Sequence, residues 1–442
     1  MKPSIVDTPT PVSATGAARW RPRIFYGWLI VGSGMVIQAM VNLLLGSAFG
    51  SYVAVLQQDY GWSKTTFSGA YAMQQIESGL LGPIQGTLID RFGPRATMRV
   101  GVTLFGLGFF VFSRMDSILT FYLAFVMIAV GSSLSGYFPI TVTVVNWFVR
   151  RRATALGLVS SGMAIGGLLA PLVAWSLSTH GWRATAFVSG VVIMAIGYPI
   201  TGVMRHTPEA YGYKPDGDTP ADPSGKPAQT STKLDKESPN FTARQALRTR
   251  AFWFIALGHA SALLVVAAVN VHLVSFLKEG KGYSVTEGAA VFALLTGASL
   301  VGQIGGGLLG DRFNKRKVVI LCMLGHAVAL LLLAYSVTVW MVVLFALIQG
   351  LAWGTRGPLM AAIRADYFGR AAFGAISGYA SLVITLGTIS GPMLAAILAD
   401  QLGDYRVGFT VLALLAGLGS IFWILAKPPH PPRQDQPAPV TA

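Results

Sequence analysis

The chain has 442 residues, of which 53% are hydrophobic and 12% are charged, and its formal net charge is +15. Soluble proteins carry about 25% charged residues, so this composition excludes a chain surrounded by water and indicates a surface that faces lipid. Most Lys and Arg residues fall on one side of the expected membrane helices, as the positive-inside rule describes. The basic surplus therefore indicates topology and argues against a nucleic-acid partner.

The expected elements begin after a cytoplasmic tail at residues 1–24, which lacks the apolar core and cleavage site of a signal peptide. A helix needs about 20 mainly apolar residues to cross a bilayer, and such stretches recur from Phe25 onward. We expect an all-α membrane protein with twelve transmembrane helices in two six-helix halves and both termini in the cytoplasm. In chain order the expected helices cover 25–54, 65–89, 97–113, 119–146, 154–178, 184–204, 252–277, 286–309, 317–336, 339–364, 372–398 and 407–426.

A polar stretch separates the two halves. Residues 205–250 are rich in Pro, Gly, Asp, Ser, Thr and Lys and cannot bury enough apolar surface to fold alone, so we expect a cytoplasmic linker there. The first half then covers 25–204 and the second covers 251–427, with a disordered tail at 428–442. Cys322 is the single cysteine, which excludes an internal disulfide.

The halves repeat a pattern of residues at a nearly constant spacing. Asp90-Arg91-Phe92 recurs 221 positions later as Asp311-Arg312-Phe313. Three further residues of the first half have counterparts in the second half at the same spacing. Gly157 corresponds to Gly378, Gly166 to Gly387 and Pro171 to Pro392. This agreement predicts duplication of a six-helix unit. Transporters built from such repeats hold their substrate near the middle of the membrane, between the repeats.

These residues also carry a resemblance to a known family. The segment Gly86-Thr-Leu-Ile-Asp90-Arg91-Phe-Gly93-Pro-Arg95 resembles the hallmark loop between helices 2 and 3 of the major facilitator superfamily. Residues 307–316 are similar to its counterpart between helices 8 and 9, with Asn314 in place of the usual Gly. The resemblance implies the major facilitator fold over nearly the whole chain.

The role of this loop can be argued from its residues. Gly86 permits close helix approach, and Asp90 lies where a helix ends. We expect Asp90 to pair with basic residues of a neighbouring loop, for which Arg150, Arg151 and Arg152 are the candidates. Such a cytoplasmic latch would favour an outward-open state, although the charges could also serve only to fix topology. The expected latch residues are Gly86, Asp90, Arg91, Gly93, Arg95, Asp311 and Arg312.

Two ionisable residues lie deep within expected helices, where a charge costs at least about 2.5 kcal/mol. Arg356 in the tenth helix offers a planar fork for a carboxylate and predicts an anion-binding site. Glu77 in the second helix is the acidic residue nearest the middle of a span and predicts proton coupling. The alternatives are a structural salt bridge, separately hydrogen-bonded charges, or a gating role for Glu77.

Other candidates for the substrate site are polar or aromatic. Asn270 and His272 lie in the seventh expected helix and could line a cavity, although His272 could instead make an interhelical hydrogen bond. The stretch from Asn146 to Gly157 resembles oxalate/formate antiporters and monocarboxylate porters. That resemblance implies that Tyr137 and Trp353 lie near the substrate. The chain lacks the basic residue of this group in helix 8 or 11, so Arg356 would serve in its place.

We therefore expect a secondary active transporter that moves a small, monocarboxylate-like organic anion across the cell inner membrane by alternating access, coupled to protons. The alternatives are export of drugs or amphipathic compounds and uptake of an iron chelate or vitamin. Drug antiporters carry Gly-Pro-x-x-Gly-Gly in helix 5, whereas this chain has Pro171 without the three glycines. The sequence contains no phosphate-binding loop, zinc spacing or nucleophile elbow. We accordingly expect no enzymatic activity, cofactor or metal, and a monomer surrounded by lipid.

Overall fold

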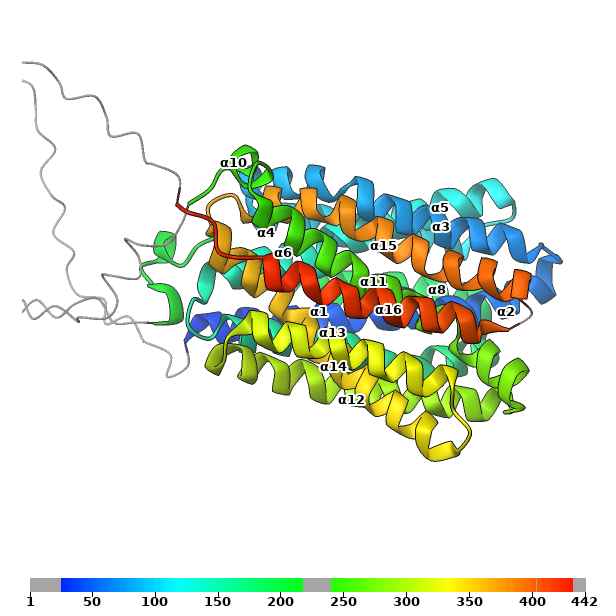
Figure 1. Cartoon of the computed structure of the whole chain (residues 1–442). Coiled ribbons are helices and arrows are strands. Elements are labelled where there is room, and N and C mark those ends of the chain that lie inside the picture. The colour runs from blue at the N-terminus through cyan, green and yellow to red at the C-terminus, as the bar shows by residue number, and fades with distance from the viewer. Residues whose placement is uncertain (1–24, 218–239, 403, 432–442) are drawn as a thin grey trace, which may run out of the picture.

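The computed structural model describes residues 25–217, 240–402 and 404–431 (Figure 1). The tail at 1–24 and most of the tail at 428–442 lie outside these residues. The described first half consists of α1 (Tyr26–Val41), the π-helical turn η1 (Asn42–Ser47), α2 (Phe49–Tyr60), α3 (Lys64–Leu80), α4 (Gly82–Ser113), α5 (Ile118–Ser135), α6 (Tyr137–Trp147), α7 (Arg152–Leu168) and α8 (Ala170–Val203).

Short elements connect this half to the second. They are the 3-10 turns η2 (Glu209–Tyr211) and η3 (Pro215–Gly217) and the helix α10 (Ala243–Leu247). The second half consists of α11 (Arg250–Ser275), the π-helical turn η4 (Phe276–Gly280), α12 (Val285–Arg312), α13 (Lys315–Ala334), α14 (Val339–Phe368), α15 (Phe373–Leu402) and α16 (Tyr405–Leu425). The fold is thus all-α over the described residues, as expected.

Glycines break two of the long helices. Gly93 has φ 79° and ψ 160° inside α4, and Gly181 has φ 78° and ψ 165° inside α8. Side chains with a Cβ rarely adopt such angles, so the chain turns at both glycines. Ten helices of the described chain are long and apolar enough to cross a membrane. The expectation of twelve crossings stays a prediction.

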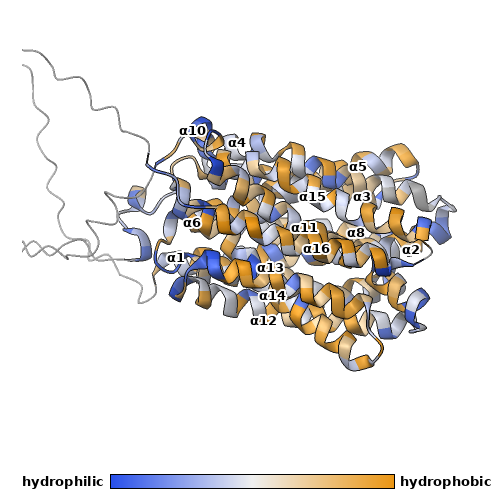
Figure 2. Ribbon diagram, viewed as in Figure 1, coloured by the Kyte–Doolittle hydropathy of each residue, from blue (hydrophilic) through white to orange (hydrophobic). Residues whose placement is uncertain are grey.

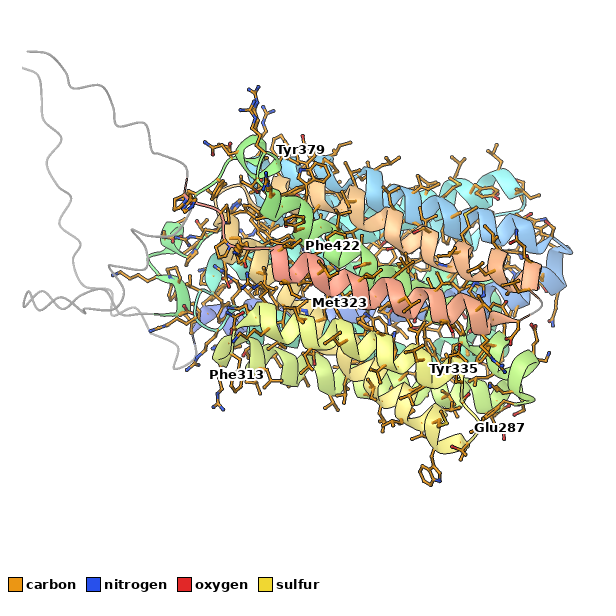
Figure 3. The ribbon with its side chains drawn as sticks, in the orientation of Figure 1. Glu287, Phe313, Met323, Tyr335, Tyr379 and Phe422 are labelled. Carbon is orange, nitrogen blue, oxygen red and sulfur yellow. The ribbon has the colours of Figure 1, made fainter. Side chains whose placement is uncertain are left out.

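The helices form an elongated bundle whose two ends differ. Apolar residues cover its body, and hydrophilic residues gather towards both ends (Figure 2). The segment 205–217, α10 and both ends of the described chain lie at one end, which we call the linker end (Figure 1). Phe313 also lies there, whereas Glu287 and Tyr335 lie at the opposite, far end (Figure 3).

The apolar core is shared at the linker end and divided at the far end. One cluster of buried side chains combines Trp147 of the first half with Phe252 and Phe368 of the second. Two further clusters each belong to a single half, around Phe105 in the first and Phe345 in the second. The halves are therefore packed together at the linker end and packed separately at the far end.

Glycines allow the halves to touch along two helix pairs. A Cβ added at Gly86 of α4 would meet the backbone of Gly374 in the α15 helix. A Cβ added at Gly307 of α12 would meet the backbone of Ala153 and Thr154 in α7. Gly86 and Gly307 are separated by the same 221 positions as the sequence repeat, so the two contacts are equivalent.

The three consecutive glycines of α12 provide a test of this packing. Gly307→Ala should lower the free energy of unfolding by about 1–3 kcal/mol, because its Cβ overlaps the backbone of α7. The control is Gly305→Ala, whose Cβ meets no atom within 4 Å, and which should leave stability unchanged or raise it by up to about 1 kcal/mol. Thermal melting in detergent measures both. Equal melting temperatures for the two variants would contradict the packing described.

Candidate functional site

A central cavity of about 680 Å³ lies between the two halves. Its wall comes from η1, α3 and α7 of the first half and from α11, α12 and α14 of the second. Among the expected site residues, Asn270 and Trp353 line it. This volume is typical of sites for small molecules.

The wall of the cavity combines apolar side chains with neutral polar ones. Its side-chain amides and hydroxyls include Asn42, Gln74, Gln75, Asn270, Ser299 and Gln303. Gln303 donates from Nε2 to Ser299 Oγ at 3.3 Å, while its Oε1 is buried and accepts no hydrogen bond. The lining residues include no Asp, Glu, Lys or Arg. The cavity can therefore hydrogen-bond a ligand and pack it against Trp353, and a ligand's charge must be balanced from beyond the wall.

Arg356 lies just beyond that wall. It follows Trp353 by three residues along α14, on the side of the linker end, and is 1% exposed. Its Nε and Nη1 atoms are buried without a hydrogen-bond partner. Tyr137, the first residue of α6, lies within its electrostatic range. Among the described residues no carboxylate forms an ion pair with Arg356, so its positive charge is uncompensated.

A second buried arginine, Arg364, was missed by the sequence analysis. The expected helix ended at 364, but α14 continues to Phe368, so Arg364 lies inside the bundle and is 8% exposed. Its Nε is also buried without a partner, and Tyr137 lies within its electrostatic range too. The available signal was its spacing of eight residues from Arg356 on the same helix.

Besides Arg356 and Tyr137, two further expected site residues, His272 and Glu77, lie outside the cavity wall. His272 Nε2 is 2.9 Å from the carbonyl oxygen of Pro392 in α15, and its ring lies 5.1 Å from that of Tyr405. Glu77 faces a separate crevice of about 270 Å³ between α3 and α5. Ser133 Oγ donates to Glu77 Oε2 at 3.0 Å, and Glu77 Oε1 is buried without a partner. The structure therefore does not bring Glu77 and Arg356 together.

The crevice and the cavity share one residue. Gln74, one helical turn from Glu77 on α3, lines both spaces. The rest of the crevice is apolar, with Met73, Ile76 and Phe125 among its lining residues. Among the described residues that line this crevice, Glu77 is thus the only charged one, and Gln74 is the polar group between it and the cavity.

The expected pairing of Asp90 with the basic loop is wrong. Asp90 Oδ2 instead accepts a hydrogen bond of 3.0 Å from the amide of Ala375, at the start of α15. Asp311 does the same for the other half, accepting from the amides of Ala153 and Thr154 of α7, both at 2.9 Å. The N-terminus of a helix carries free N–H groups and a partial positive charge. A backbone donor therefore replaces the expected arginine.

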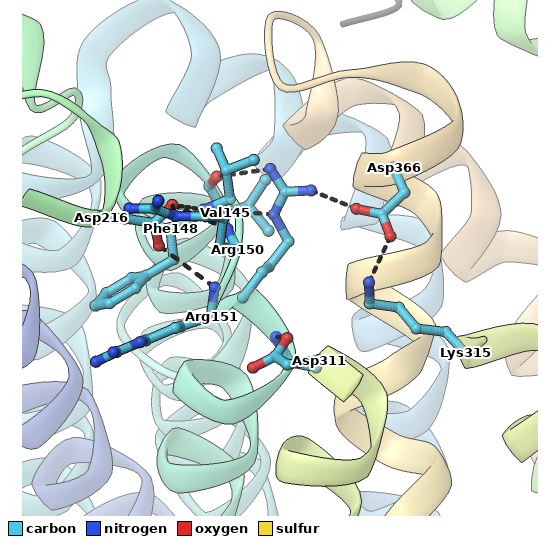
Figure 4. Close-up of polar contacts among 11 residues, drawn as sticks. Val145, Phe148, Arg150, Arg151, Asp216, Asp311, Lys315 and Asp366 are labelled. Atoms are coloured by element: carbon cyan, nitrogen blue, oxygen red, sulfur yellow. Dashed lines mark hydrogen bonds and ion pairs between the residues drawn. The ribbon is translucent and has the colours of Figure 1, made fainter. Parts of the chain in front are cut away.

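The basic loop has acidic partners of its own. Arg152 pairs with Asp366 at 2.7 Å, and Lys315 pairs with the same carboxylate at 2.9 Å (Figure 4). Asp216 accepts hydrogen bonds from the amides of Val149 and Arg150 at 3.1 and 2.9 Å (Figure 4). Because Arg152 belongs to the first half and Asp366 to the second, this cluster joins the halves at the linker end.

The remaining latch residues have separate positions. Gly93 forms the turn in α4, and Arg95 donates to the carbonyl oxygens of Gly202 and Met204 at the end of α8. Arg91 is exposed and lies 5.2 Å from the ring of Phe92, and Arg312 is also exposed. Arg95 therefore fixes the first half locally and Arg91 and Arg312 face solvent, whereas Gly86, Asp90 and Asp311 contact the opposite half.

The beginning of the expected linker packs against both halves. Arg205 lies between the rings of Tyr26 and Tyr211, at 4.1 and 4.2 Å. Glu209 pairs with Arg370 of the second half. Burial lowers the pKa of His206, although the nearby carboxylate of Asp90 opposes this shift. Residues 205–217 thus add a further connection at the linker end.

Comparison with known proteins agrees with the fold. A model of the Major Facilitator Superfamily matches residues 35–307 and 255–442. Monocarboxylate transporter 11 of Homo sapiens is 27% identical over 94% of this chain and 86% of its own length. Monocarboxylate transporter 13 of Bos taurus is 25% identical over 92% of this chain and 90% of its own.

A solved structure supports the same assignment. The fucose:proton symporter FucP of E. coli superposes with a TM-score of 0.69 at 16% identity, covering 90% of this chain and 98% of FucP. Two halves with a cavity between them, a family match over nearly the whole chain and a shared fold lead to one conclusion. The chain belongs to the Major Facilitator Superfamily and is a multi-pass membrane transporter that resembles the monocarboxylate group.

Proposed function

We propose that this transporter carries a small, monocarboxylate-like organic anion across the cell inner membrane by alternating access. The observation that carries the proposal is Arg356, a buried and uncompensated positive charge beside a neutral polar cavity. Burying a charge without a partner costs several kcal/mol. A carboxylate that entered the cavity and reached the guanidinium would remove that cost and form two parallel hydrogen bonds.

The names of the relatives agree with an anionic substrate. Two of them are monocarboxylate transporters. In this chain Asn270, Gln303 and Trp353 offer hydrogen bonds and an aromatic surface to the rest of such a molecule. Tyr137 lies near the guanidinium and adds a hydroxyl group.

We assign the linker end to the cytoplasm and the far end to the outside. The basic residues concentrate in the segments of the linker end, which supports this orientation under the positive-inside rule. Twelve crossings follow if α3 and the part of α4 before Gly93 form one span and the long segment Arg152–Val203 forms two, separated at Gly181. The shared core and the ion pairs at the linker end then describe a state that is closed to the cytoplasm.

We assign proton coupling to Glu77. Its carboxylate lies in an apolar crevice in which, among the described lining residues, it is the only charged group, and a buried acidic group of this kind is suited to carrying a proton. Gln74 lines both the crevice and the cavity, so a change at Glu77 can reach the substrate site through α3. In this proposal, protonation of Glu77 accompanies anion binding at Arg356 without direct contact between the two.

The same crevice favours a second candidate function. An acidic group within an apolar pocket suits an amphipathic cation, and Met73, Ile76 and Phe125 supply the apolar surface. Export of amphipathic compounds is therefore the alternative. This alternative predicts that an amphipathic cation binds at Glu77 and that its binding does not depend on Arg356.

Replacement of Arg356 tests the anion site. Arg356→Ala should reduce uptake of labelled pyruvate or lactate by about 30-fold or more, because loss of one partner of a buried charge pair costs 2–5 kcal/mol. Arg356→Lys should retain part of the activity, since it keeps the charge and loses the planar fork. The control is Arg99→Ala, which removes an exposed arginine of α4. Undiminished uptake by the Arg356→Ala variant across a panel of carboxylates would refute the anion site.

Replacement of Glu77 tests the coupling. Glu77→Gln should exchange substrate across proteoliposome membranes at near wild-type rates, because exchange requires no net proton movement. The same variant should lose accumulation driven by an imposed pH gradient. Glu279→Gln, at an exposed site in η4, is the control and should accumulate substrate normally. Gradient-driven accumulation by Glu77→Gln would remove this residue from the coupling role.

Replacement of Asp311 tests the closure of the linker end. Asp311→Ala removes the cap of α7, and loss of a cap costs about 0.5–2 kcal/mol, so the open state should become about 2–30 times more populated. A cysteine at the buried position Ser377 of α15, with Cys322→Ser, reports this opening through its rate of labelling by an impermeant reagent. Ser377 is remote in sequence from the capped α7, so faster labelling indicates opening between the halves.

The control is Asp400→Ala, which removes an exposed carboxylate towards the end of α15 and should leave the labelling rate unchanged. A labelling rate in Asp311→Ala equal to that of the control would show that this cap does not hold the linker end closed.

A further inference from the structure

Between the level of the cavity and the linker end, α14 carries a second buried positive charge that the proposed function does not use. Arg364 is 8% exposed, and its Nε is buried without a hydrogen-bond partner. Asp366, the nearest acidic residue along α14, is occupied by Arg152 and Lys315. Among the described residues, Arg364 therefore has neither an ion pair nor a hydrogen bond that would balance its burial.

Arg364 and Arg356 act on the same interior. Tyr137 of α6 lies within electrostatic range of both guanidinium groups. His259 of α11 also lies within range of both charges, and its Nδ1 is buried without a partner. Both arginines thus interact electrostatically with Tyr137 and His259, and in the described part of the chain no carboxylate forms an ion pair with either of them. An intramembrane charge retained at this cost is functional by default.

The spacing separates the two arginines into different positions along α14. Eight residues correspond to about 12 Å along a helix, which exceeds the length of a small monocarboxylate. In order from the cavity towards the linker end, α14 presents Trp353, then Arg356, then Arg364. Directly beyond them lies the cluster of Arg152, Asp366 and Lys315, which joins the halves. Arg364 therefore lies immediately inside the closed end.

We propose that Arg364 is a second anion-binding station, which holds the carboxylate group of the substrate when the linker end opens and the far end closes. This inference rests on the proposed function. Arg356 receives the anion from the central cavity, and Arg364 binds it on the linker side, before release or after entry from that side. The two stations make the carrier asymmetric, because each face of the membrane presents a different arginine.

The test measures half-saturating concentrations separately on the two faces. The full chain is reconstituted in proteoliposomes of known orientation, and exchange of labelled pyruvate is followed with the varied concentration on one face at a time. Arg364→Gln should raise the half-saturating concentration on the linker face by at least about tenfold over wild type. The half-saturating concentration on the far face should stay within about twofold of wild type. Arg364→Lys should restore part of the affinity on the linker face only.

Controls separate binding from structure. Arg99→Gln removes an exposed arginine of α4 and should leave the half-saturating concentration unchanged on both faces. If Arg364→Gln raised the half-saturating concentration equally on both faces, or did not raise it on the linker face, the second station would be overturned. Arg356 would then remain as the anion site. If Arg364→Gln fails to fold, Arg364→Lys carries the same test, because it keeps the charge. Absence of pyruvate and other carboxylate exchange in the wild type would instead refute the proposed function itself.

Discussion

The arrangement of the molecule depends on carboxylates that cap helices of the opposite half. Asp90 of α4 binds the start of α15, and Asp311 of α12 binds the start of α7. Each carboxylate satisfies backbone N–H groups that a helix cannot satisfy itself and meets the positive end of its dipole. Because both caps lie at the linker end, they hold the halves together there and leave the far end divided. The central cavity and the shared apolar core follow from this one-sided attachment.

The closed linker end also determines the state of the arginines. Arg356 and Arg364 are enclosed in an interior without carboxylate partners, so the closed protein contains charges that are costly to bury. A bound anion offsets the free-energy cost of burying these arginines, and the offset is largest in conformations that exclude water from the site. The anion therefore stabilises conformations that enclose it, and only such differential affinity can shift an equilibrium between conformations. Under the proposed function, the charge that makes the empty site unfavourable becomes the means by which an anionic substrate drives closure around itself.

Several features were predictable because they leave a local signal in the sequence. An arginine within a long apolar stretch pointed to Arg356, and the repeat spacing predicted equivalent halves. The partner of Asp90 was not predictable, because a backbone N–H group belongs to every residue except proline and has no signature in the sequence. Arg364 was missed because the end of a helix is poorly defined by composition. The position of Glu77 was not predictable, since it depends on which face of α3 meets α5.

The π-helical turn η1 has a consequence for how one helix serves two cores. The chain from Tyr26 to Tyr60 passes from α1 through η1 to α2. Ile30 and Ile37 of α1 belong to the cluster shared by both halves, whereas Tyr52 and Leu56 of α2 belong to the cluster of the first half alone. A π-turn contains one extra residue, which rotates the following helix by about 100°. This insertion changes the face that the helix presents, so one continuous helix can pack first into the core shared by both halves and then into the core of the first half alone.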